Sequence, residues 1–557
     1  MGTGQRAKTS PNLNYLVALM LVAAFFVWLW HPTFERCSID SYDVVTTSAI
    51  DLKNCKLSEL PSSISRFVSL KKLDLGNNVL HSLPDALPPS LETLFCLNNA
   101  FETIPPVIAT LPRLRMLSFK SCRLRDLGVA PLPESLAWLI LTDNELVALP
   151  DSLGRLTGMR KLMLANNKLG SLPSSMGAMR ELELLRLSNN RLPAPPPWLY
   201  ELPKLTWLAI AGNPFVAPAP ARASLPDVRF DELTLGPKLG EGTSSIVRQG
   251  LWHGEMVAIK LYKAALSSDG MNLDEVRASC AVDHPHVLRW LGYLSEGEGE
   301  KARAVASVST AWRLVGVLEW APGFSSLGKP PSMESITRDT YKPSTSFASA
   351  EIREIGAGLA AALEHLHGRG LSHGDVYAHN VLWKRASSEA GPSRLHHRRR
   401  HHHHHREGAA AGAAAGGGDT EGGGAAAEDD GRAMAKLSDF GAAFYYGPGS
   451  AHAASYERME QRAFGLLLAE LLERHDGSEP ELLEPVRLAS RLAMAAAPED
   501  RPGFARLARQ LELEDSLDEE SQRGPPLGRA ARRGLRPRSS FGRVLPRGHP
   551  HYEDREG

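Results

Sequence analysis

The sequence lacks several features that would place it in a class at once. Its 557 residues include only 5 cysteines, which excludes a scaffold held together by many disulfides. It has no net charge, since 63 lysines and arginines balance 63 aspartates and glutamates. This balance argues against a body that binds polyanions as a whole, so no specific nucleic-acid partner is expected. No N-x-Ser/Thr glycosylation acceptor occurs in the chain.

Only one long apolar run is present, YLVALMLVAAFFVWLW at residues 15–30. It is shorter than the roughly 20 residues that span a bilayer comfortably, but Trp28 and Trp30 stand where interfacial aromatics belong. We predict a transmembrane signal anchor behind a short basic N-terminus at 1–14. A cleaved signal peptide and a buried helix are the alternatives. Because no second run follows, everything after residue 31 should lie on one side of the membrane.

The pattern L-x-x-L-x-L-x-x-N-x-L recurs between residues 45 and 216. Its asparagine position falls at eight places 21 to 23 residues apart, with cysteine at two of them: 55, 78, 99, 122, 144, 167, 190 and 213. This period is the leucine-rich-repeat signature and predicts about eight repeats that stack as an α/β solenoid around one core. The cysteines at 55, 96 and 122 occupy repeat positions. They are therefore expected to pack in the core rather than to form a disulfide or bind a metal.

Apolar side chains also alternate with the core leucines along the predicted strands. Such positions face the concave side of a solenoid, where an exposed apolar column indicates a surface for a protein ligand. The alternative is that a neighbouring domain or the N-terminal segment covers it. The column consists of Phe95, Met116, Trp138, Ile140, Met163 and Trp207.

A Pro/Ala-rich linker at 217–228 precedes a second region, 229–515, with motifs in a fixed order. They are G-E-G-T-S-S-I-V at 240–247, V-A-I-K at 257–260, L-V-G-V-L-E-W-A-P-G at 314–323, H-G-D-V-Y-A-H-N at 373–380, K-L-S-D-F-G at 436–441 and P-E-D-R-P-G-F at 498–504. This series resembles the motifs of protein kinases. The resemblance implies a bilobal α+β protein-kinase fold that uses ATP and Mg²⁺.

The resemblance also implies roles for single residues. Lys260 would hold the α- and β-phosphates, and Glu275, or its neighbour Asp274, would hold the lysine. Asp375 would act as the catalytic base. The Mg²⁺ ligands would be Asn380 and Asp439, and ATP would contact Leu239, Gly240, Gly242, Val247, Ala258, Lys260, Glu319 and Ala321.

The region departs from the family's pattern in ways that put its substrate in doubt. Gly374 occupies the position of an arginine that in kinases usually binds a phosphorylated residue of the activation segment. Tyr377 occupies the position where Ser/Thr kinases usually have a lysine. The segment 439–460 is short and has no A-P-E motif, which leaves Arg501 without its usual glutamate partner. Ser279 is polar at a position one turn after Glu275, where the corresponding helix of kinases usually has an apolar core residue. None of these departures removes ATP binding.

Two further segments have a biased composition. Residues 385–435 separate two motifs that a kinase joins by a tight hairpin, and their Gly/Ala content predicts a disordered insertion. The run RRRHHHHHR at 398–406 is interpreted as a repeat expansion rather than a metal site. Residues 516–557 form a basic tail that is expected to be disordered.

The sequence therefore predicts a membrane-anchored leucine-rich-repeat protein kinase in signal transduction. It would phosphorylate Ser/Thr, or Tyr, hydroxyls of a protein substrate while its repeats recruit a protein ligand. The alternative is a pseudokinase scaffold that binds ATP without turnover. The single apolar run predicts a single-pass membrane protein. The need for ATP favours an orientation in which the kinase domain faces the cytosol. Arg6 and Lys8 favour the opposite orientation.

Overall fold

The computed structural model describes residues 37–217, 225, 228–242, 244–267, 269–294, 314–385 and 434–512. The repeats and the second region belong to one compact unit that ends at Glu512. The predicted anchor at 15–30, nearly all of the insertion and the basic tail lie outside the described residues. Among the described residues, no helix is both long and apolar enough to cross a bilayer.

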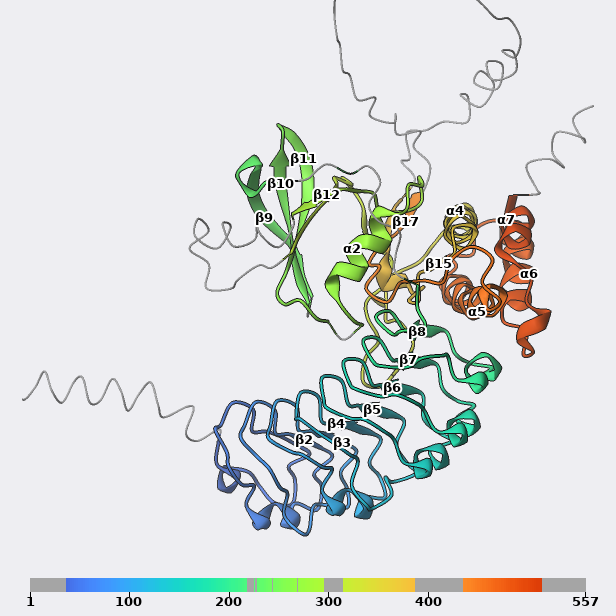
Figure 1. Ribbon diagram of the computed structural model, residues 1–557. Helices are drawn as coiled ribbons and strands as arrows, with labels where there is room; N and C mark the ends of the chain where they lie inside the picture. Colours follow the sequence, from blue (N-terminus) through green and yellow to red (C-terminus); the bar gives the residue numbers. More distant parts are fainter. Residues whose placement is uncertain are drawn as a thin grey trace, which may run out of the picture. The chain divides into compact units, whose positions relative to one another are not determined.

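Eight short strands form one parallel sheet in chain order, as the repeat period predicts (Figure 1). A leucine or isoleucine at the centre of each strand pairs in register with the next, from Ile50 opposite Leu73 to Leu185 opposite Leu208. These central side chains are buried, so the repeats share one core. The strands are β1 (Ala49–Asp51), β2 (Lys72–Asp74), β3 (Thr93–Phe95), β4 (Met116–Ser118), β5 (Trp138–Ile140), β6 (Lys161–Met163), β7 (Leu184–Arg186) and β8 (Trp207–Ala209).

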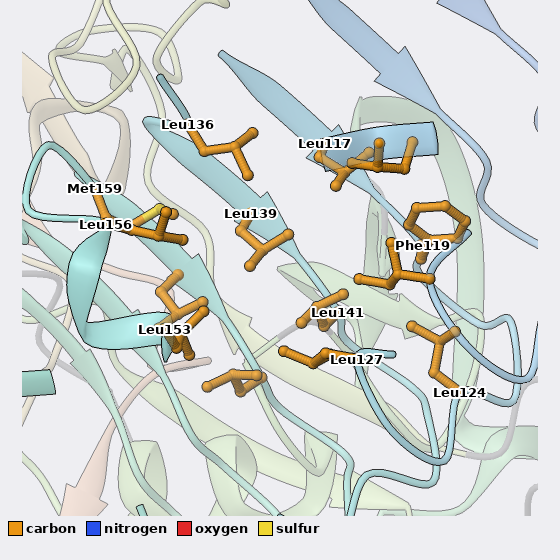
Figure 2. Close-up of a cluster of buried hydrophobic side chains, with 14 of the residues drawn as sticks. Leu117, Phe119, Leu124, Leu127, Leu136, Leu139, Leu141, Leu153, Leu156 and Met159 are labelled. Atoms are coloured by element: carbon orange, nitrogen blue, oxygen red, sulfur yellow. The ribbon is translucent and has the colours of Figure 1, made fainter. Parts of the chain in front are cut away.

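The core is filled by side chains from the strands and from the turns on the opposite side of each repeat. Figure 2 shows Leu117 and Leu139 from two strands packed with Leu153 from a short 3₁₀ turn. Phe119 meets Phe101 edge to face, with ring centroids 5.1 Å apart. No single repeat encloses these side chains, so each depends on its neighbours.

The asparagine that recurs in most repeats links two repeats through its side chain. Asn167 donates from Nδ2 to the carbonyl oxygens of Leu164, at 2.9 Å, and of Leu141 in the preceding repeat, at 3.0 Å. The residue before it, Asn166, has a φ of 57°, a left-handed conformation that asparagine tolerates. The same pair recurs along the solenoid and explains why the turn selects asparagine.

The prediction that Cys55 only packs was wrong. Cys55 forms a disulfide with Cys37, whereas Cys96 and Cys122 are free and buried as expected. The difference follows from position. Cys122 donates to the carbonyl oxygen of Cys96 in the preceding repeat, at 3.0 Å. Cys55 lies in the first repeat, which has no preceding repeat to bond to, and the bridge instead ties down the capping segment that contains Ile39.

The second region begins with a five-stranded antiparallel sheet in the order β12-β13-β11-β10-β9 and one helix. Its core is separate from that of the repeats and includes Ile259, Val315 and Val317. The elements are β9 (Leu233–Glu241), β10 (Ser245–Trp252), β11 (Glu255–Tyr262), α2 (Asn272–Cys280), β12 (Trp290–Leu294) and β13 (Val315–Glu319).

A larger helical part follows (Figure 1). Helix α4 buries a stripe at helical spacing, with Ile352, Ile355, Leu359 and Leu363, against α5 and α7. The helices are α4 (Ser349–Gly368), α5 (Ala453–Leu472), α6 (Glu484–Ala493) and α7 (Phe504–Glu512). Short strand pairs carry the motif loops: β14 (Ser325–Ser326), β16 (Val381–Lys384) and β17 (Met434–Leu437) in one sheet, and β15 (Leu371–Ser372) with β18 (Phe444–Tyr445) in another. β16 and β17 pair with each other, and the predicted insertion begins directly after β16 and ends within β17.

Candidate active site

Lys260 lies at the centre of the candidate site. Strand β11 presents its Nζ 2.5 Å from Glu275 Oε1 on α2 and 3.4 Å from Asp439 Oδ1. Burial alone would lower the pKa of Lys260, but the two carboxylates outweigh burial and raise it. Lys260 is therefore a fixed cation. Of the two acidic residues that the sequence offered, Glu275 is the partner, whereas Asp274 lies 3.6 Å from Arg277.

Asp439 and Asn380 lie at the ends of two paired strands. Asp439 has a φ of 59°, and the nearby charge of Lys260 lowers the pKa of its carboxyl group. Asn380 donates from Nδ2 to the carbonyl oxygen of Asp375 at 3.1 Å, so its Oδ1 is the atom available as a ligand. An ionised carboxylate and an amide oxygen are hard donors that suit Mg²⁺. The residues present therefore fit the implied metal.

Glu460 holds the backbone at the start of the H-G-D-V-Y-A-H-N loop (373–380), the catalytic loop. This residue lies on α5 and accepts hydrogen bonds from the backbone N–H of Gly374 and from Ser372 Oγ, the latter at 2.8 Å. His367 approaches its other oxygen at 2.7 Å. These contacts lower the pKa of Glu460 against the effect of burial. Glu460 thus fixes the backbone of this loop through hydrogen bonds.

The residues expected to contact ATP lie on strands β9, β10, β11 and β13 of the five-stranded sheet or directly after them. Gly240 lies near the end of β9 and Gly242 in the turn that follows, and a Cβ built on either would have no heavy atom within 4 Å. Leu239, also near the end of β9, is exposed. Backbone N–H groups at such a turn can approach phosphate oxygens closely.

The other predicted ATP contacts sit on the neighbouring strands. Val247 on β10 pairs with Lys260, and Ala258 on β11 pairs with Leu318 on β13. Glu319 accepts hydrogen bonds from Lys436 Nζ at 2.8 Å and from the backbone N–H of Arg289 at 2.9 Å. Ala321 follows it and is half-buried. These positions lie on or next to strands that pair with β11, and their contact with ATP stays a prediction.

Asp375 has a different environment from Asp439. It is only 7% exposed, and burial raises its pKa to about 7. Its Oδ2 lies 3.9 Å from His379 Nε2, and His379 in turn lies 2.8 Å from Asp339 through Nδ1. The catalytic carboxylate is therefore placed as predicted but is covered.

Residues of the repeats make up this cover. The backbone N–H of Leu208 in β8 donates to the carbonyl oxygen of Gly374 at 3.1 Å, and Thr206 Oγ1 lies 2.9 Å from the hydroxyl of Tyr377. Arg186 in β7 pairs with Asp269, whose carboxylate lies 2.6 Å from its Nε. Sequence reasoning missed these contacts. The only signal was that Arg186 occupies a concave-face position of its repeat.

The predicted concave column is divided by this contact. Met163 and Trp207 are buried with Tyr377 and Ala442, and Trp138 and Ile140 pack at the edge of that cluster. Near the other end Met116 is buried and Phe95 is half-buried. A neighbouring domain therefore covers the C-terminal part of the column, which was the alternative. Whether the rest binds a protein ligand stays a prediction.

The sequence matches the protein kinase domain family over residues 233–459 and the leucine-rich-repeat family over residues 134–192. The chain carries leucine-rich repeats and a protein kinase domain. The family match to the kinase domain begins at β9 and ends within α5, so it includes Lys260, Glu275, Asp375, Asn380 and Asp439.

Curated relatives are similar to one part of the chain or the other. Podocan-like protein 1 of Mus musculus is 33% identical over 133 residues, which are 22% of this chain and 24% of that protein. A probable serine/threonine-protein kinase of Dictyostelium discoideum is 26% identical over 161 residues, 28% of this chain and 15% of that protein. The chain thus spans less than a quarter of the length of either relative. Among solved structures, a leucine-rich-repeat protein of Leptospira interrogans aligns with 29% of this chain and 48% of its own at 29% identity and a TM-score of 0.26.

The repeats also supply a hydrogen-bond acceptor to Arg501, whose usual glutamate partner is missing from the short activation segment. Among the described residues Arg501 forms no ion pair with a glutamate and instead donates to backbone carbonyl oxygens of Pro203 in the repeats and Arg458 on α5, both at 2.9 Å. Tyr200 of the repeats lies 3.1 Å from Tyr456 between their hydroxyl oxygens. The last repeats therefore support the kinase domain where its own segment is reduced.

Proposed function

We propose that this protein is an ATP- and Mg²⁺-dependent protein kinase that phosphorylates hydroxyl groups of a protein substrate. The observation that carries the proposal is the contact of Lys260 with both Glu275 and Asp439. Lys260 is buried and held by Glu275, and it also contacts the half-exposed Asp439. This arrangement is suited to bind a nucleoside triphosphate together with its metal ion. The order of the motifs supports the same function.

Each residue has a distinct task in this reaction. Lys260 binds and orients phosphate oxygens, and Glu275 prevents the lysine from turning away. Mg²⁺ held by Asp439 and Asn380 would offset phosphate charge. Asp375 accepts the proton of the acceptor hydroxyl. Because the protein mainly positions groups and neutralises charge, loss of Asp439 should abolish transfer without unfolding the domain.

The test compares the full-length chain with Asp439→Ala, using labelled ATP, Mg²⁺ and a generic acceptor such as dephosphorylated casein. We expect incorporation in the wild type that Asp439→Ala reduces at least tenfold. Measurable incorporation in the wild type that Asp439→Ala leaves unchanged would refute the proposed activity. Phosphoamino-acid analysis of the product then distinguishes Ser/Thr from Tyr transfer, and we propose Ser/Thr.

A second candidate function has one observation in its favour. Asp375 is covered by the repeats, so the chain could bind ATP and act as a scaffold whose repeats recruit a protein partner. Titration of Mg·ATP into the wild type and Asp439→Ala separates the two functions. Binding without transfer under any condition supports the scaffold.

We propose that the protein is anchored in a membrane through residues 15–30, with the kinase domain facing the cytosol because ATP is abundant there. One observation opposes this orientation, since a disulfide such as Cys37–Cys55 persists best in an oxidising compartment. Protease added to sealed, cytosol-facing vesicles tests the proposal. A protected kinase domain would refute it and place the repeats on the side where the disulfide is stable.

A further inference from the structure

The two sides of the candidate site differ sharply in their exposure. The side chain of Asp439, on the nucleotide side, is 54% exposed, whereas that of Asp375 is 10% exposed. One Asp375 oxygen, Oδ1, is buried and has no hydrogen-bond partner among the described residues. A base has to reach the hydroxyl that it deprotonates. The arrangement is therefore open to nucleotide and closed to an acceptor.

The cover over Asp375 consists of backbone as well as side chains. Trp207 forms an antiparallel bridge with Asp375, next to the hydrogen bond from Leu208 to Gly374. The ring of Trp207 lies 5.3 Å from that of Tyr377 and 5.9 Å from that of His379, between centroids. A protein segment presenting a hydroxyl would have to displace this strand.

The covering face also complements the charge of the site. Arg186 pairs with Asp269, and its guanidinium lies 4.6 Å from the Trp207 ring centroid. Lys161 on the next strand is buried over the ring of Trp138, at 4.2 Å. Basic side chains of the repeats, Arg186 above all, thus lie near the carboxylates of the site.

The kinase domain is shaped for this contact. Gly374 has a φ of 77°, and a Cβ there would lie 2.5 Å from the carbonyl oxygen of Leu208 and 2.6 Å from that of Ala442. A residue with a side chain at 374 would therefore collide with the repeat strand and with its own activation segment. The absence of the family's arginine, which the sequence left unexplained, follows from the docked repeats.

We propose that the concave face of strands β6 to β8 is an autoinhibitory cover that admits nucleotide to the kinase site but excludes a protein acceptor. The proposal rests on the proposed kinase function. Transfer to a protein requires the repeats to move away from the catalytic loop, and contacts that hold them there keep the enzyme inactive. This role extends the repeats from binding a partner to controlling the catalytic centre.

The experiment uses the full-length chain and two variants that weaken different contacts. Arg186→Glu places a carboxylate against Asp269, and Thr206→Glu places one against Tyr377. Lys168→Glu is the matched control, because Lys168 is an exposed repeat lysine paired only locally with Glu145. Hydrogen exchange of peptides covering 206–210 and 371–380, binding of Mg·ATP and phosphorylation of dephosphorylated casein are measured for each protein.

We expect faster exchange in both peptides and at least a tenfold rise in casein phosphorylation for Arg186→Glu and Thr206→Glu, with Mg·ATP affinity within threefold of the wild type. Lys168→Glu should match the wild type, and Asp439→Ala added to Arg186→Glu should remove the gain. A wild type that phosphorylates casein as fast as both variants would overturn the cover while leaving the kinase function intact.

Two other outcomes also contradict the proposal. If neither variant loosens the catalytic loop, these contacts do not hold a cover. If the loop loosens and Mg·ATP binds but no transfer occurs in any protein, the autoinhibitory cover and the proposed catalytic function fail together. The scaffold function then remains.

Discussion

Lys161 is a buried basic side chain beside the candidate site. It lies on the concave face and is 5% exposed, and burial, together with nearby Arg186, lowers its pKa to about 7. The carboxylates of Asp375, Asp269 and Asp339 oppose this shift. Because the folded-state pKa is below the unfolded value, the folded protein sheds this proton first as pH rises. Charged Lys161 therefore costs stability below about pH 7, and that cost fades towards higher pH.

Replacing Lys161 by methionine should stabilise the protein in a pH-dependent way. We expect the free energy of unfolding to rise by about 2 kcal/mol near pH 6. The gain should shrink towards pH 9.5, because the wild type then no longer carries the buried charge that the methionine removes. Melting temperatures of the wild type and Lys161→Met at both pH values measure it. Lys168→Met is the exposed control. A gain that is constant across this range would contradict a pKa lowered by burial.

Glu275 and Asp274 are adjacent, but only one reaches Lys260. Glu275→Gln should reduce phosphotransfer at least tenfold, since Lys260 loses the charged partner that orients it. Asp274→Asn should stay within twofold of the wild type because Asp274 contacts Arg277 instead. Assays in the Arg186→Glu background make transfer measurable if the wild type is inhibited. Equal effects of the two substitutions would refute this assignment.

The turn of each repeat is the element that joins one repeat to the next. In most repeats an asparagine bonds carbonyl groups of two repeats and also accepts a backbone N–H, as Asn167 Oδ1 does from Leu146 at 3.1 Å. Cys122 Sγ contacts the carbonyl oxygens of Cys96, at 3.0 Å, and Lys120, at 3.5 Å, but a thiol is a weaker donor and acceptor than the asparagine amide. Turn positions should therefore differ in what they contribute to stability.

Asn167→Ala should destabilise the repeats by about 2–4 kcal/mol, because it leaves several buried backbone groups unpaired. Cys122→Ala should cost about 1 kcal/mol, because only a weak thiol bond and a small volume are lost. Chemical denaturation followed by circular dichroism measures both. A larger loss for Cys122→Ala than for Asn167→Ala would show that the side chains do not stabilise the turns through these hydrogen bonds.

The repeats and the kinase domain share a hydrophobic cluster as well as polar contacts. The repeat core continues through Leu208 and Ile210 to Phe444, Tyr456 and Met459 of the kinase domain. Such continuity resembles the interior of one domain more than a surface contact between two. The last repeats are therefore expected to stay associated with the kinase domain even when the covalent link between them is cut.

A protease site inserted within residues 217–226 tests this expectation. After cleavage in native buffer, the two parts should co-elute on size exclusion and separate only in denaturant. The matched control is a cut within 386–433, where the β16–β17 pair and the surrounding core should also hold the parts together. Separation after the first cut alone would show that the shared cluster is too weak to hold the repeats in place.

Much of the site could be predicted because its information is local. The repeat period placed each leucine in the core, and the motif order placed Lys260, Asp375 and Asp439 in one site. The pairing of Arg186 with Asp269 could not be predicted, because the two residues belong to patterns with no relation in sequence. Cys55 was mistaken for a packing residue because its repeat position is the same as that of Cys122, and only its place at the end of the stack differs.

By itself the amino-acid sequence determined the two folds and predicted a set of residues for ATP, since periodic burial and motif spacing act along the chain. Only the tertiary structure decided that the concave face of the repeats lies over the catalytic loop. It also explained Gly374, where a repeat carbonyl leaves no space for a side chain, and Arg501, which bonds the repeats instead of a glutamate. The physical reason is that docking depends on shape and charge matching between distant surfaces, which no local pattern encodes.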